Sequence, residues 1–224
     1  DQVIDRLKSK LNDEFSYVRD FALREILALI KEDLLEFGVD HNHWFSEAEL
    51  YKSEPHNLSK VDQSIEELSS KGFVYEKEGA IWFKSSELGD DKDRVLKRGN
   101  GEFTYFASDV AYHLDKYDRG YDRIINIWGS DHHGYLPRVK AAMEASKKNV
   151  EKLEVVFIQF ANLIRAGKKV TMSTRSGEFI TLKELIEEVT SEAARFFYIN
   201  RKADQHLDFD LDLAKQQSKD NPLY

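Results

Sequence analysis

The feature that most constrains the fold of this chain is a pair of short apolar runs separated by a helical segment. Residues 124–128 read Ile-Ile-Asn-Ile-Trp and residues 155–158 read Val-Val-Phe-Ile, which is typical of buried strands. A helix is expected between them over residues 136–145. Because a strand, a helix and a second strand form the unit of parallel sheets, the pattern predicts an α/β fold.

A polar loop directly follows the first apolar run, at the edge where parallel sheets bind ligands. Gly129 lets the backbone approach a ligand closely, and Asp131 could accept hydrogen bonds from a ribose diol. His132 and His133 could donate to a phosphate or recognise a polar substrate. The alternative is a tight turn in which Asp131 only caps the next helix, and the position of the loop favours ligand binding.

The same Asp-His-His run is open to a metal interpretation, because carboxylate and imidazole groups are common zinc or iron ligands. Adjacent side chains rarely point at one ion, and no further helical pair of histidines completes the set. A metal-dependent phosphohydrolase around Asp131, His132 and His133 is therefore the weaker alternative. No tightly bound metal is expected.

A second candidate site lies upstream. Residues 103–106 are expected to form a short strand, with Ser108 as the cap of the following helix. Tyr105 would end the strand and Asp109 would begin the helix, so both could face one crevice and hold a guanidinium. An acid in the first helical turn is also favoured by the helix dipole alone, so the pattern leaves the two interpretations even.

A third candidate is the basic loop over residues 168–177. Its lysines, hydroxyl groups and arginine could close over a triphosphate and stabilise the charge on a departing pyrophosphate. The loop lacks the P-loop pattern of Gly, four residues and Gly-Lys-Ser/Thr. From these residues alone, a solvated basic loop is the favoured interpretation.

The segments around these candidates have clear local patterns. Apolar residues recur at helical spacing over residues 15–30, and Gly38 suits the end of that helix. A second amphipathic helix is expected over residues 59–72, and residues 73–83 have the pattern of a β-hairpin.

The last part of the chain is expected to contain two helices and an extended tail. Thr181 and Glu184 form the pattern of a capping box, and Ser191 opens another helix. Residues 207–213 alternate between apolar residues and aspartate, which predicts an extended segment in which a helix could begin.

Composition limits the class of protein. The chain has 224 residues, a net charge of −8 and no cysteine, so disulfides and thiolate metal sites are excluded. The acidic average argues against non-specific coating of nucleic acid. No apolar run is long enough to cross a membrane, and a cytoplasmic location is predicted. The chain begins at Asp1 rather than methionine, which indicates that it belongs to something longer.

Four stretches together resemble a known family. Residues 103–117, 125–142, 172–178 and 204–212 resemble, in order and spacing, a common bacterial form of arginyl-tRNA synthetase. The resemblance is specific from about Gly101 onward, and the earlier residues resemble the family's variable insertion only loosely. It implies a class I enzyme that forms arginyl-adenylate from arginine and ATP, the ATP as its Mg²⁺ complex, and then esterifies tRNA(Arg).

The resemblance also implies an architecture. The chain would hold the second half of a split Rossmann-like parallel sheet with flanking helices, preceded by a mainly helical insertion with a β-hairpin. The implied domains are the insertion over 1–95, the second half of the nucleotide-binding catalytic domain over 96–190, and a helical connection toward an anticodon-binding domain over 191–224. The His-Ile-Gly-His signature of the first half is absent, so the chain alone is expected neither to activate arginine nor to charge tRNA.

Individual residues gain implied roles in the same way. Tyr105 and Asp109 match the tyrosine and aspartate that contact arginine, and His132 stands where the family often has a glutamine. The residues implied to bind ATP, through the Gly-x-Asp element of class I enzymes and its neighbour, are Gly129, Asp131 and His133.

The basic loop matches the Lys-Met-Ser-Lys element of the family in part. Met172 and Ser173 match its middle, whereas neither flanking lysine is present. Arg175, Lys168 or Lys169 would then supply the missing charge during catalysis.

A second alternative for the function of the chain is a non-catalytic module that has kept the fold and binds tRNA or a partner chain.

Overall fold

The computed structural model describes residues 8–11, 14–55, 57–170 and 179–223. Contacts divide the chain into two compact units, each described here by itself. The split unit consists of Asp1–Asn42, Ala161–Lys202 and His206–Tyr224, and the central unit consists of His43–Phe160 and Ala203–Gln205. The predicted domain boundaries after residues 95 and 190 stay a prediction.

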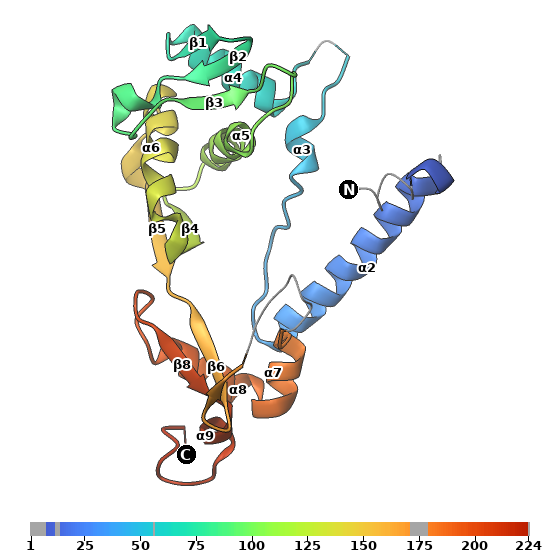
Figure 1. Cartoon of the computed structure of the whole chain (residues 1–224), viewed down its shortest axis with the longest axis vertical. Coiled ribbons are helices and arrows are strands. Elements are labelled where there is room, and N and C mark those ends of the chain that lie inside the picture. The colour runs from blue at the N-terminus through green and yellow to red at the C-terminus, as the bar shows by residue number, and fades with distance from the viewer. Residues whose placement is uncertain (1–7, 12–13, 56, 171–178, 224) are drawn as a thin grey trace. The chain divides into compact units, whose positions relative to one another are not determined.

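In the central unit, two parallel strands confirm the predicted strand–helix–strand arrangement (Figure 1). Strand β4 (Ile124–Gly129) pairs in parallel with β5 (Leu153–Ile158). The connection between them contains η2 (Ser130–Tyr135), α6 (Leu136–Ala145) and η3 (Val150–Lys152). The loop 129–134 therefore lies at the carboxyl end of β4, as the sequence predicts.

A three-stranded antiparallel sheet precedes this parallel pair in the chain. Its strands β1 (Val74–Lys77), β2 (Ala80–Phe83) and β3 (Arg94–Lys97) lie in that order. The predicted hairpin is confirmed, and Glu78 and Gly79 both adopt positive φ in its turn, at 54° and 73°. The fold of the chain is thus a mixed α/β arrangement with parallel and antiparallel pairing.

Short helices complete the central unit and close its core. They are α3 (Ala48–Tyr51), α4 (Lys60–Ser70) and the 3₁₀ turn η1 (Ser85–Leu88). The predicted amphipathic helix over 59–72 is confirmed, since α4 buries Val61, Ile65 and Leu68 and is capped by Ser59. The largest fully buried apolar side chains of this core are Leu50, Leu68, Phe83, Leu96 and Met143.

Helix α5 (Tyr105–Asp118) begins earlier than the sequence predicts. Thr104 is its N-cap and accepts a hydrogen bond from the backbone N–H of Ala107, whereas Ser108 lies inside the helix. The Thr104 hydroxyl also donates to the carbonyl of Val95 at 2.8 Å, which fixes the helix start against β3. The predicted strand over 103–106 and the Ser108 cap are therefore wrong, and Tyr105 begins the helix instead of ending a strand.

The split unit contains a second sheet with three strands. In it β6 (Ala161–Arg165) lies between β7 (Lys168–Lys169), which is antiparallel, and β8 (Leu207–Asp210), which is parallel. The predicted extended tail is confirmed as β8. Asp210 then accepts hydrogen bonds from two backbone N–H groups and caps α9 (Leu211–Lys215), so a helix does begin inside the tail.

Two further helices pack on this sheet. The capping box of α7 (Leu182–Val189) is confirmed, because Thr181 and Glu184 exchange side-chain and backbone hydrogen bonds. Helix α8 (Ser191–Ile199) follows at once, with Thr190 as its cap. Phe197 of α8 stacks on Phe209 of β8, with ring centroids 5.0 Å apart.

The predicted first helix is confirmed as α2 (Glu14–Glu36), which also belongs to the split unit. Gly38 lies two residues beyond its last residue and has a left-handed φ of 76°, as the sequence predicts for the end of this helix. Helix α2 buries none of its 23 residues. In the described ranges, no helix combines the length and the apolar content needed to cross a membrane.

Candidate functional site

A cavity of about 710 Å³ lies in the central unit, at the carboxyl end of β4. Its walls come from helix α5, from the segment around α3, and from the end of β4 with η2. The residues that line it are Phe45, Glu47, Leu50, Tyr105, Ser108, Asp109, Tyr112, Ile127, Trp128, Gly129, His132 and Tyr135. This volume is in the range of pockets that bind small molecules.

The cavity brings together four of the residues predicted from the sequence. Tyr105 and Asp109 lie one helical turn apart on α5, because the helix starts at Tyr105. Gly129 and His132 line the cavity from the end of β4 and from η2. The side chain of Tyr105 is 86% exposed.

Asp131 and His133 do not line the cavity. The ring of His133 stacks on Phe157 with centroids 3.7 Å apart, and its Nδ1 is hydrogen-bonded to a backbone carbonyl. Asp131 turns back toward Gly129, where an added Cβ would lie only 2.5 Å from the Asp131 Oδ1 atom. Glycine at position 129 therefore lets this carboxylate fold over the strand end.

This geometry does not favour the metal-dependent hydrolase. Asp131 Oδ2 lies 3.6 Å from His132 Nε2, whereas the His133 ring is held against Phe157. Three side chains must converge on one point to hold an ion, and these do not. Over the described residues, no group of three His, Cys, Asp or Glu side chains could hold a metal.

Asp109 is the acidic centre of the cavity. Its side chain is 33% exposed and lines the cavity together with Tyr135. Burial, followed by the charge and hydrogen bond of Asp109, raises the pKa of Tyr135 well above its usual value. Tyr135 is therefore neutral over the whole physiological range, and its hydroxyl can donate a hydrogen bond.

A directed chain of hydrogen bonds ties the backbone of Asp109 to strand β4. Lys116 Nζ donates to Asn126 Oδ1 at 2.7 Å, and Asn126 Nδ2 lies 2.7 Å from His113 Nε2. His113 Nδ1 lies 2.8 Å from the carbonyl of Asp109. Because lysine can only donate, the amide of Asn126 has one orientation, so His113 accepts at Nε2 and donates from Nδ1.

The two basic groups of this chain are shifted by their surroundings. Burial first, and then the neighbouring Lys116 charge, lower the pKa of His113. Burial also lowers the pKa of Lys116, against the opposing effect of the Asp109 charge. His113 is therefore neutral at pH 7, as its role of acceptor at Nε2 requires.

Aromatic rings form most of the remaining walls. Phe45 stacks on Tyr112 with centroids 4.5 Å apart, and the Trp128 ring meets Tyr135 edge to face at 5.8 Å. Aromatic faces attract cations through their quadrupole. A cavity with these walls and the carboxylates of Asp109 and Glu47 is suited to an organic cation that forms hydrogen bonds.

The structure adds residues that sequence reasoning missed. Tyr112 and Tyr135 line the cavity beside the predicted site, and the spacing of Tyr112 from Asp109 on one helix could have indicated it. Phe45 and Glu47 come from a segment about sixty residues upstream of Tyr105. No local pattern marks them, because only the packing of α3 against α5 brings them there.

The predicted catalytic loop is described only at its beginning. Lys168 and Lys169 form the exposed strand β7 of the split unit. Met172, Ser173 and Arg175 lie outside the described residues. Their predicted roles stay predictions.

Known proteins resemble this chain over most or all of its length. Residues 11–212 match the family model of tRNA synthetases class I (R), catalytic domain. Over the whole chain, arginine–tRNA ligases from Nitrosospira multiformis and Hydrogenovibrio crunogenus are 55% and 57% identical. The chain spans only 38% and 37% of the length of these relatives.

Solved structures give a similar result. A crystal structure from Campylobacter jejuni described as an arginyl-tRNA synthetase is 37% identical, with a TM-score of 0.86 over 95% of this chain and 45% of that one. The Thermus thermophilus arginyl-tRNA synthetase is 17% identical with a TM-score of 0.74, over 98% of this chain and 47% of that one, which shows a shared fold.

Proposed function

The chain belongs to the catalytic-domain family of the class I (R) tRNA synthetases, and from this premise we propose that it carries the arginine-binding part of an arginine–tRNA ligase. The whole protein would activate arginine with ATP, as its Mg²⁺ complex, and transfer it to tRNA(Arg). The chain alone, which covers less than two fifths of its relatives, would do neither.

One observation carries the proposal: the Asp109 carboxylate lies in an aromatic cavity at the carboxyl end of a parallel strand. A guanidinium is planar and always charged, and it pairs with a carboxylate through two hydrogen bonds. Tyr105 lies one turn before Asp109 and His132 lines the cavity from η2, so both could contact the same ligand.

The reaction sets the orientation of the ligand. A carboxylate oxygen of arginine attacks the α-phosphorus of ATP, a P–O bond to the departing pyrophosphate breaks, and arginyl-adenylate forms. If Asp109 holds the guanidinium, the carboxylate end of arginine is free to face Gly129 and Asp131 at the rim. There we propose that Gly129, Asp131 and His133 bind ATP, since ligands of parallel sheets sit beyond the strand ends.

We assign the loop over 168–177 to the triphosphate. Met172 and Ser173 would be the remnant of the Lys-Met-Ser-Lys element, and Arg175 would stabilise the charge that develops on pyrophosphate. A cytoplasmic location is part of the same proposal, since translation supplies the tRNA there.

The finer fold assignment is also a proposal. The parallel pair β4–β5 would belong to the second half of a split Rossmann-like sheet, with an insertion over 1–95 and a helical connection over 191–224. The exposure of β4 supports this, because Ile125 is 50% exposed. Parallel sheets are normally covered on both faces, so a larger sheet with helices would cover it.

Asp109→Asn in the full-length protein tests the proposed function. Loss of a charged hydrogen bond costs about 1.5–3 kcal/mol, so the KM for arginine should rise roughly 10- to 150-fold. The KM for ATP should stay within about twofold, because the proposed nucleotide site at Gly129, Asp131 and His133 does not include Asp109. Arginine-dependent exchange of pyrophosphate into ATP is the measurement.

Asp118→Asn is a matched control for this experiment. Asp118 is on the same helix but outside the cavity, and its side chain is 69% exposed. It should leave both KM values unchanged. Equal increases in the KM for arginine and for ATP in Asp109→Asn would contradict a guanidinium contact.

A further inference from the structure

Tyr135 lines the same cavity as Asp109, and its hydroxyl is close enough to the Asp109 carboxylate for that charge to raise the pKa of the phenol. The two residues come from different elements, since Asp109 lies on α5 and Tyr135 ends η2. A carboxylate on a helix has several rotamers within reach. A phenol hydroxyl beside a carboxylate can hold one of these rotamers by donating to one oxygen, and the other oxygen is then free for a ligand.

The ring of Tyr135 is itself held from several sides. Phe106, Trp128 and His132 meet it edge to face, with centroids 6.3, 5.8 and 6.4 Å away. The guanidinium carbon of Arg138 lies 4.8 Å from the ring centroid. These contacts restrict the motion of the ring and so limit the positions of its hydroxyl.

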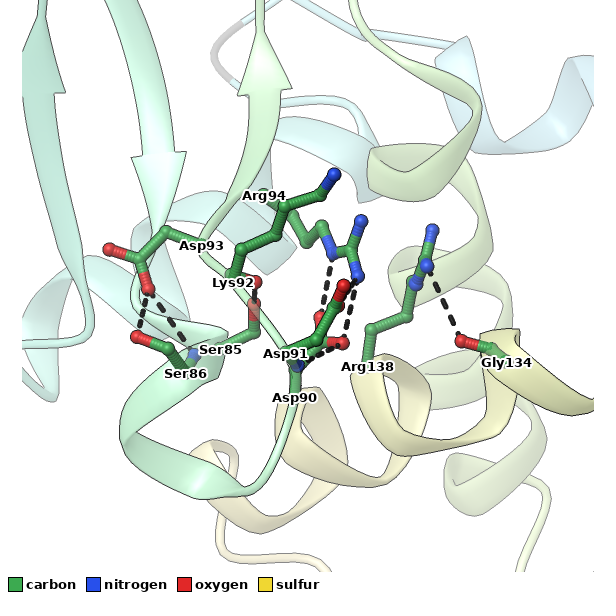
Figure 2. A network of polar contacts seen from close by, with 9 residues as sticks. All are labelled: Ser85, Ser86, Asp90, Asp91, Lys92, Asp93, Arg94, Gly134 and Arg138. Carbon is green, nitrogen blue, oxygen red and sulfur yellow. Dashed lines mark hydrogen bonds and ion pairs between the residues drawn. The ribbon is translucent and has the colours of Figure 1, made fainter.

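Two arginines whose charges act on Tyr135, Arg94 and Arg138, are held by polar contacts of their own (Figure 2). Arg94 donates to both oxygens of Asp90, at 2.7 and 2.8 Å, and the side chain of Asp90 is 2% exposed. Arg138 donates to the carbonyl of Gly134. The charges of Arg94 and Arg138 both act on the Tyr135 hydroxyl, and positive charge nearby makes a phenol a stronger donor.

We propose that Tyr135 is a positioning residue for arginine binding, which holds the Asp109 carboxylate in the orientation that pairs with the guanidinium. The inference rests on the proposed function and names a residue that acts through Asp109 rather than on the reacting atoms. Its effect should therefore fall on the affinity for arginine and leave the chemistry and ATP binding unchanged.

Tyr135→Phe in the full-length protein is the direct test, because it removes only the hydroxyl and keeps the ring. Loss of one hydrogen bond to a charged group should raise the KM for arginine about tenfold. The kcat and the KM for ATP in pyrophosphate exchange should stay within about twofold. An unchanged KM for arginine, or an equal rise in the KM for ATP, would overturn the inference.

Tyr117→Phe is the matched control. Tyr117 lies on α5, outside the cavity, and its hydroxyl donates to the backbone carbonyl of Asn149 at 2.9 Å. This variant also loses one tyrosine hydrogen bond, so it reports what a merely structural loss does. It should leave the KM for arginine unchanged even if its melting temperature falls.

A double-mutant cycle separates positioning from structure. If Tyr135 acts through the carboxylate, Tyr135→Phe should change the KM for arginine less than about twofold when Asp109→Ala is already present. A further tenfold rise in that background would show an independent role and overturn the inference.

The same experiments separate two kinds of failure. A wild-type protein without arginine-dependent exchange, or an Asp109→Asn variant without effect, would sink the proposed function itself. A normal wild type and an impaired Asp109→Asn, together with a silent Tyr135→Phe, would sink only the role of Tyr135.

Discussion

Helices α2 and α5 differ sharply in how they are used, although both have apolar residues at helical spacing. Helix α5 has 14 residues, of which seven are buried, and its remaining face contributes Tyr105 and Asp109 to the cavity. Helix α2 has 23 residues and buries none, with Tyr17, Leu29 and Leu35 between 59% and 70% exposed. Periodicity thus predicts that a helix forms, but the partner decides what the helix contributes.

The largest expected difference between α5 and α2 is in how much a substitution on each helix lowers the free energy of unfolding. Leu114→Ala on α5 removes a side chain that is 6% exposed in the core, and is expected to destabilise the central unit by about 2–4 kcal/mol. Urea unfolding followed by tryptophan fluorescence measures this, because Trp44, Trp82 and Trp128 all belong to the central unit. A loss below about 1 kcal/mol would mean that α5 is packed no better than α2.

A polar residue of α5 should show the same dependence on its partners. His113→Leu leaves Asn126 buried without one of its partners, which is expected to cost roughly 1–3 kcal/mol at pH 7. The pKa of His113 is lowered in the folded state, so its contribution is complete above its ordinary value near 6.5 and is lost as the pH falls below it.

The gap in unfolding free energy between wild type and His113→Leu should therefore narrow from pH 7 to pH 5. Urea unfolding at both pH values measures it. A gap that stays constant or widens toward pH 5 would contradict a histidine that is held neutral.

The smallest effect is expected on α2. Leu29→Ala removes a side chain that is 59% exposed, and the free energy of unfolding of the chain should change by less than about 0.5 kcal/mol. Circular dichroism is the suitable probe, because this helix belongs to the split unit. A loss comparable with that of Leu114→Ala would show that α2 has a partner in solution and would remove the contrast between the two helices.

The sequence predicts those features whose signals are local. The capping box of Thr181 and Glu184 and the helix end at Gly38 each depend on residues within one turn, and both are confirmed. The start of α5 was misplaced because Thr104 is held by carbonyls of β3, a contact between separate elements. A single sequence contains no direct signal for such contacts.

The same distinction applies to the candidate site. Asp109 and Gly129 could be predicted from local patterns. Asp109 lies near the start of a helix, and Gly129 is the last residue of a strand. Glu47 and Tyr135 were not, because their place in the cavity depends on how α3 and η2 pack against α5. Sequence reasoning thus identified part of the lining of the cavity, and the structure added the rest of its walls.

The hydrogen bonds from Lys116 through Asn126 to His113 have a mechanical consequence. Asn126 is a strand residue that is bonded twice to α5, on two successive turns of the helix. A rotation or slide of α5 would break both bonds at once, so helix and strand are expected to move as a single body. A displacement of Asp109 by a ligand in the cavity would then also displace the end of β4, where the nucleotide is proposed to bind.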